Sequence, residues 1–182
     1  MSNAINVTDM SETFSGCYNL TEAPVIPPNV TDMFSTFYSC FKFTEAPTIP
    51  PNVTNMYQTF ASCSGLTSPP TIPANVTDMS FTFHDCINLT SAPVIPSSVT
   101  NMAFTFASCT NIEGDIFVHT NKVLIAGGMN NCFQYTNALL PKSVYMPYTG
   151  YNATHNTYLA AINASIDGNY GVTVMDINTY LG

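Results

Sequence analysis

The chain has 182 residues and a net charge of −8 at pH 7; 46% of it is hydrophobic and only 8% is charged. It has no Arg, and its Lys residues stand at Lys42, Lys122 and Lys142. Binding to nucleic acid or to anionic lipid depends on clustered Lys and Arg, so this composition argues against both classes of partner. No stretch approaches 18 apolar residues, so no membrane span is predicted.

One repeat begins near the N-terminus and dominates the sequence. Its length is the separation between Cys17 and Cys40. Residues of one type recur at this step in four series: Cys17, Cys40, Cys63, Cys86, Cys109 and Cys132; Val7, Val30, Val53, Val76 and Val99; Met10, Met33, Met56, Met79 and Met102; Phe14, Phe37, Phe60, Phe83 and Phe106. A fixed period of this length predicts a stacked array, because one such unit cannot bury its own apolar face.

Each unit divides into two halves, which the second unit illustrates. Its apolar residues follow a spacing of 3, 4 and 3, at Val30, Met33, Phe37 and Cys40. This spacing predicts a short helix over 30–40, with Asn29 or Thr31 as its cap. Residues 45–50 predict a short strand, since the prolines there have no N–H to donate. The following Pro-Asn pair predicts a turn into the next unit.

The first unit lacks the strand half that precedes the other units. Val7, Met10 and Phe14 nevertheless repeat the inward-facing pattern of the interior units. Capping units usually carry polar substitutions on their outer side, and none is seen here. We therefore expect an open N-terminal end and self-association through the N-terminal coil.

The repeat weakens after Cys109. Residues 113–119 predict a strand without proline, and residues 121–132 predict a looser unit that keeps the repeat length. Residues 139–141 and 144–147 predict the last strand. Beyond this the period is lost. Residues 153–164 predict a helix and 172–175 a closing strand, which together form a C-terminal cap over 148–182.

The repeat words resemble those of the BspA-like, or Treponema-type, leucine-rich repeats. The resemblance rests on Asn29-Val30-Thr31-Asp32-Met33, followed by Phe37, Cys40 and Ile49-Pro50, and extends over 1–147. It implies an arc-shaped, right-handed α/β repeat solenoid of about six 23-residue coils, with the short α+β cap at 148–182. Pro47 and its equivalents stand where the family usually has a strand residue, so a more broken sheet is expected.

The cysteine series has three interpretations. Stacked coils about 4.8 Å apart bring neighbouring cysteines within disulfide range, although parallel Cβ vectors would strain the bond. A metal site needs ligands that converge from different directions, and a ladder does not provide this. The third interpretation is a buried column of free thiols that pack as small apolar residues.

Large aromatic residues gather at the variable positions of the first three units. A scaffold requires constancy in its core and not on its surface, so variable aromatics predict a contact surface. The alternative is that some of them fill gaps between helices. The candidate binding residues are Tyr18, Phe34, Tyr38, Phe41, Lys42 and Tyr57.

No constellation for catalysis is recognised, so an enzyme is not expected. His84 has no nucleophile at a recognisable spacing. One repeat position carries Asp9, Asp32 and Asp78, interrupted by Asn55 and Asn101, and forms a polar column. This column has two interpretations: calcium binding, or compensation of a helix dipole. No cofactor or metal is predicted.

The family resemblance implies adhesion, as on bacterial surface proteins, some protist surface proteins and phage tail proteins. The predicted function is therefore a non-enzymatic binding module, of surface-adhesin or phage receptor-binding type, that recognises a protein or glycan receptor. The expected location is extracellular, on a cell surface or on a virion. The alternative is a structural virion or filament subunit that assembles through the open solenoid end.

Overall fold

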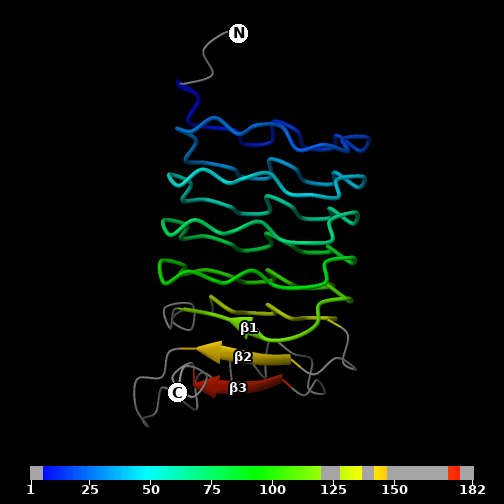
Figure 1. Ribbon diagram of the computed structural model, residues 1–182, viewed down its shortest axis with the longest axis vertical. Helices are drawn as coiled ribbons and strands as arrows, with labels where there is room; N and C mark the ends of the chain where they lie inside the picture. The colour runs from blue at the N-terminus through cyan, green and yellow to red at the C-terminus, as the bar shows by residue number, and fades with distance from the viewer. Residues whose placement is uncertain (1–5, 120–127, 137–141, 147–171, 177–182) are drawn as a thin grey trace.

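The computed structural model describes residues 6–119, 128–136, 142–146 and 172–176, and these form a repeat solenoid. The coils stack along one axis, with the N-terminal coil at one end and a small sheet at the other (Figure 1). Successive coils pair in parallel, one repeat apart, through the bridges Asp9–Asp32, Asp32–Asn55, Asn55–Asp78 and Asp78–Asn101. The repeat array predicted from the period is confirmed.

The helix predicted over 30–40 is wrong. The described residues contain no α-helix, and this segment is a series of turns. The N–H groups of Met33 and Phe37 donate to the next coil, to the carbonyl oxygens of Asn55 and Thr59 at 3.0 and 2.9 Å. Other N–H groups close turns within the coil, such as Thr36 N–H to the Met33 carbonyl at 3.2 Å. A helix satisfies its amides within its own segment, whereas this coil directs alternate amides to its neighbour.

Left-handed backbone conformations explain why no helix forms. Ser35 and Ser39 have φ values of 49° and 60°. The same two positions recur with positive φ in the other coils, at Glu12, Gln58, Phe81 and Phe104 and at Gly16, Ser62, Asp85 and Ser108. A residue in the left-handed region interrupts a right-handed helix and reverses the chain locally. Each reversal brings the next apolar residue back to the core, so turns produce the same 3-4-3 spacing as a helix.

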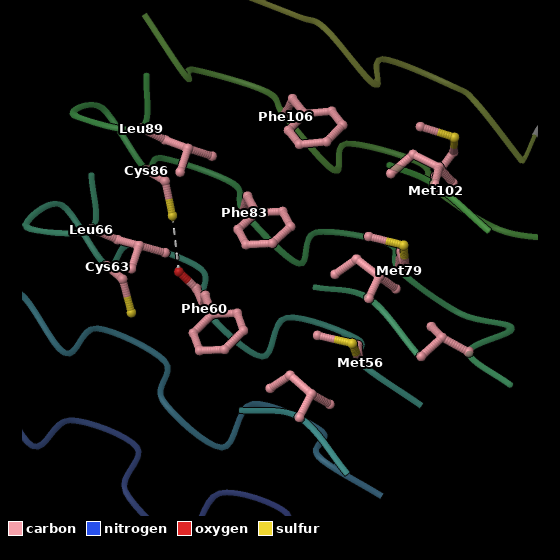
Figure 2. Packing of buried hydrophobic residues seen from close by; sticks show 14 of the residues in the cluster. Met56, Phe60, Cys63, Leu66, Met79, Phe83, Cys86, Leu89, Met102 and Phe106 are labelled. Carbon is pink, nitrogen blue, oxygen red and sulfur yellow. Dashed lines mark hydrogen bonds between the residues drawn. The ribbon is translucent and has the colours of Figure 1, made fainter. Parts of the chain in front are cut away.

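The core consists of columns of identical residues that run along the solenoid axis. Phe37, Phe60, Phe83 and Phe106 are fully buried, and their rings stack on one another with centroids 5.5 to 5.7 Å apart. Methionine and cysteine columns lie on either side of this phenylalanine column (Figure 2). Burying each such side chain contributes roughly 1.5–3 kcal/mol, so the stacking of coils is what stabilises each one.

The sixth coil is shifted relative to the regular period. The Met79 N–H donates to the carbonyl of Asn101. One repeat later, the regular period would place the acceptor of the Met102 N–H at position 124. The Met102 N–H instead donates to the carbonyl of Gly128, beyond that position. Phe133 consequently continues the phenylalanine column, stacking on Phe106 at 5.8 Å. The assignment of Cys132 to the cysteine column is therefore wrong. Four additional residues move it into the neighbouring column of buried threonines.

Three strands form a parallel sheet in the order β1-β2-β3. They are β1 (Ile116–Phe117), β2 (Lys142–Met146) and β3 (Val172–Asp176). Their positions agree with the strands predicted within 113–119, 144–147 and 172–175. Because β3 pairs with β2 throughout, part of the predicted cap continues the sheet. The helix predicted over 153–164 and the strand residues predicted at 139–141 lie outside the described residues, and the boundary between 1–147 and 148–182 stays a prediction.

The prolines leave the strand halves weakly paired. Thr67 N–H donates to Thr44 and Thr90 N–H to Thr67, at 3.4 and 3.1 Å, next to an isolated bridge between Glu45 and Ser68. Beyond this bridge, 47–49 and 69–72 make no backbone hydrogen bond within the described parts of the chain. The broken sheet expected from the prolines is therefore observed, and the turn halves provide most of the pairing between coils.

Candidate functional site

Tyr18 and Phe41 form an exposed aromatic pair. They occupy the same position in successive coils, and their rings stack at 5.2 Å with an angle of 9° between planes. Their exposed fractions are 57% and 46%, which is unusual for large apolar side chains. Stacking in neighbouring coils holds both rings in place, so this exposed pair is an ordered apolar patch on the surface.

Phe34 and Tyr57 form a second pair, which is half-buried. Their rings stack at 5.2 Å with an angle of 7°. Tyr38 is 37% exposed, and Lys42 is exposed beside Phe41 in the chain. The structure thus places the six predicted residues as two stacked pairs and two exposed single side chains. All six reach the surface, and none belongs to the buried core.

Phe81 and Phe104 extend the second pair, and they were missing from the residues predicted by sequence. Phe81 lies 5.7 Å from Tyr57, and Phe104 stacks on Phe81 at 4.7 Å. Phe34, Tyr57, Phe81 and Phe104 therefore form one aromatic strip across four coils. The signal in the sequence was the appearance of Phe at a position that carries Glu12, Ser35 and Gln58 in other units.

The backbone at Phe81 and Phe104 is in an unfavourable conformation for a bulky residue. Their φ values are 57° and 56°, in the left-handed region that favours Gly and Asn. The same repeat position has positive φ in Glu12, Ser35 and Gln58, so the turn imposes this conformation. The His84 ring also lies 5.6 Å from Phe81, and its Nδ1 is 2.9 Å from an Asp85 carboxylate oxygen. The polar side chains of His84 and Asp85 thus border the strip.

Stacking determines what the aromatic surfaces can contact. Within each pair one ring covers the face of the next, so the strip offers mainly ring edges to a ligand. Ring edges carry partial positive charge and favour carbonyl oxygens and apolar side chains. A sugar that stacks flat on a ring needs an uncovered face. Among these stacked rings, uncovered ring faces are found only on the outer sides of the exposed pair and at the ends of the strip.

The cysteines are present as thiols and not as disulfides. Cys40, Cys63 and Cys86 are fully buried, whereas Cys17 in the first coil is exposed. Burial raises the pKa of Cys40 to about 11, with a further contribution from the neighbouring Cys17. Burial also raises the pKa of Cys63 and Cys86 well above the ordinary value. Protonated thiols are poor nucleophiles and metal ligands, which agrees with the buried-thiol interpretation.

The Asp/Asn column forms turns and does not cap helices. An Asp32 carboxylate oxygen accepts the N–H of Phe34 at 2.8 Å, and Asn55 does the same for Tyr57 at 2.9 Å. The Asn55 amide also donates to Asp32 at 3.1 Å, so Asn55 separates the charges of Asp32 and Asp78, whereas Asp9 and Asp32 are direct neighbours in the column. The helix-dipole interpretation is wrong, because the described part of the column has no helix to cap. Among the residues that the structure describes, no three His, Cys, Asp or Glu side chains are grouped as metal ligands.

The stacked parallel coils define this chain as a repeat solenoid, a class of binding scaffold. The chain belongs to the BspA-type leucine-rich repeat family, whose model matches residues 5–113 and 33–158 in six copies. The resemblance seen in the repeat words is thereby confirmed. Members of such a family are generally non-enzymatic, protein-binding repeat modules.

A leucine-rich repeat protein of known structure from Bacteroides ovatus ATCC 8483 is similar to the chain. The two share 18% sequence identity and a TM-score of 0.51, over 94% of this chain and 53% of that one. The chain thus spans about half the length of that protein. At this identity the likeness supports the fold alone. No match was found among curated proteins. No helix in the described part of the chain is long and apolar enough to cross a membrane.

Proposed function

We propose that the chain is an adhesion module that binds a protein receptor through the exposed pair, Tyr18 and Phe41, and the aromatic strip. The observation that carries this proposal is the ordered exposure of large aromatic side chains on a scaffold with a constant core. Interface hot spots are enriched in aromatic residues, and preformed side chains lose little entropy on binding. Tyr38 and Lys42 are the polar members of the same surface.

Charge and family support a location outside the cell, on a cell surface or a virion. BspA-type repeats commonly occur on surface or secreted proteins. The scarcity of Lys and the absence of Arg offer few cleavage sites to trypsin-like proteases, which suits that environment.

Self-assembly through the N-terminal coil is a second candidate function. Cys17 is exposed and Phe14 half-buried, whereas their equivalents in the second coil, Cys40 and Phe37, are fully buried. A partner that covers the first coil would extend the columns. A sedimentation series across concentration tests this, and Val7→Lys with Phe14→Lys should abolish any oligomer. A chain that stays monomeric throughout excludes this candidate.

The receptor proposal is tested with a panel of purified extracellular proteins and a glycan array. We expect binding to one or more proteins, and a loss of about tenfold or more in affinity for Tyr18→Ser with Phe41→Ser. The matched control is Thr54→Ser with Thr77→Ser, which alters two exposed threonines and should bind normally. Binding that survives the aromatic substitutions, or binding to glycans only, would contradict the proposal.

A further inference from the structure

A continuous apolar trough crosses the strand halves of the first five coils. It consists of three hollows of about 460, 500 and 370 Å³, each within the size range of ligand sites. The first two hollows share Pro47 and Thr48, and the last two share Pro70 and Thr71. The trough thus follows the solenoid axis, and proline is the commonest residue in its lining.

The backbone along the trough presents more hydrogen-bond acceptors than donors. Residues 69–72 make no backbone hydrogen bond within the described parts of the chain. Each of them has a carbonyl group, but only Thr71 and Ile72 have an N–H, because Pro69 and Pro70 have none. A ligand that brings N–H donors complements this surface better than one that brings acceptors.

Exposed carboxylate residues stand next to the lining of the trough in the chain. Glu22 and Glu45 are exposed and directly precede Ala23 and Ala46, which line it. Asp115 is exposed and occupies, in the fifth coil, the repeat position of those alanines. No lysine, arginine, aspartate or glutamate lines any of the three hollows, and His119 lines the third. The charged residues that stand next to the lining in the chain are carboxylates, which complement a cation.

We propose that the trough binds an extended, cationic segment of a partner protein. The aliphatic stems of Lys or Arg would pack on the proline rings, while their charged ends meet Glu22 and Glu45 and backbone carbonyls. Four steps between coils of about 4.8 Å span about 19 Å, which an extended peptide covers with about six residues. This surface is separate from the aromatic strip, and the proposal does not depend on the proposed function.

The test uses a fluorescein-labelled peptide of alternating Lys and Val, about eight residues long, and its Glu-Val counterpart. Fluorescence anisotropy should show salt-sensitive binding of the Lys peptide alone. Glu22→Gln with Glu45→Gln should weaken its binding about tenfold. Glu12→Gln with Asp85→Asn changes the net charge equally in the turn halves and should leave the Kd within about twofold.

A second variant tests the trough itself. Thr48→Arg with Thr71→Arg places cations inside it and should abolish binding of the Lys peptide, with the melting temperature used to verify folding. Equal weakening by both neutralising pairs would overturn the proposal in favour of nonspecific attraction. Absence of binding to the unmodified chain at about 1 mM peptide would also overturn it. Tyr18→Ser with Phe41→Ser should leave this binding unchanged, which separates the trough from the receptor surface.

Discussion

The thiol of Cys86 donates a hydrogen bond to the backbone carbonyl of Phe60 in the preceding coil, with Sγ and O 3.1 Å apart (Figure 2). The same bond recurs in the earlier coils, from Cys40 to Phe14 and from Cys63 to Phe37, at 3.2 and 3.0 Å. Each buried thiol thus gives a second donor to a carbonyl of the preceding coil, which already accepts an N–H from its own coil. The cysteine column is a column of donors as well as of small apolar side chains.

The first prediction concerns thiol reactivity. In the native protein a thiol reagent should modify Cys17 quickly and leave the buried cysteines unmodified until the chain unfolds, because the thiolate is the reactive form. Counting released thionitrobenzoate before and after denaturation measures this. Cys17→Ser should remove the fast phase. Rapid native labelling of Cys63 would contradict the buried column.

The second prediction concerns stability. Cys63→Ala should lower the free energy of unfolding by about 1–2 kcal/mol, because it leaves a small cavity and removes one of the two donors to the buried Phe37 carbonyl, which keeps the Cys40 N–H. Cys17→Ala, at the equivalent but exposed position, should be nearly neutral. Urea denaturation of both variants measures the difference. Equal and small losses would show that the column contributes little.

The third prediction concerns alkaline pH. The folded pKa of Cys40 is about 11, above the ordinary 9.0, so the folded state retains its proton when the unfolded state loses it. Stability should therefore be constant below pH 9 and fall as the pH rises toward 11. Each buried thiol should contribute up to about 1.4 kcal/mol per pH unit in that window. Cys63→Ala should make the fall less steep, and urea denaturation between pH 7 and 11 measures it.

The sequence predicts the repeat array but not the backbone conformation of its coils. A period counts residues between equivalent positions, so it correctly predicts which side chains stack, from Phe14 to Phe106. It does not distinguish a helix from turns, since both return an apolar residue to the core after three or four positions. The small or polar residues at Gly16, Ser39 and Asp85 were the available sign of left-handed turns.

Two errors follow from counting alone. Cys132 stands one full repeat step after Cys109, but the hydrogen-bond register shows four additional residues in that coil, so the matching spacing is coincidental. The predicted aromatic surface covers only the first three units, because later units carry Ser80 and Ala103 at the repeat position of Phe34 and Tyr57. Phe81 stands one position later than Ser80, the repeat equivalent of Tyr57, and only the folded turn brings its ring against that of Tyr57.

The last prediction concerns Phe81 and Phe104, whose positive φ should make them expendable for stability. Asn tolerates the left-handed region, so Phe104→Asn should relieve roughly 1–2 kcal/mol of backbone strain. It also removes a stacked pair worth about 0.5–1.5 kcal/mol, and the two effects nearly cancel. The melting temperature should therefore change little. Phe106→Ala, in the buried column nearby, should cost about 3–5 kcal/mol and serves as the contrast.

If the strip is a receptor surface, Phe104→Asn should weaken receptor binding while the fold persists. A strongly destabilised Phe104→Asn variant would instead assign the strip to packing.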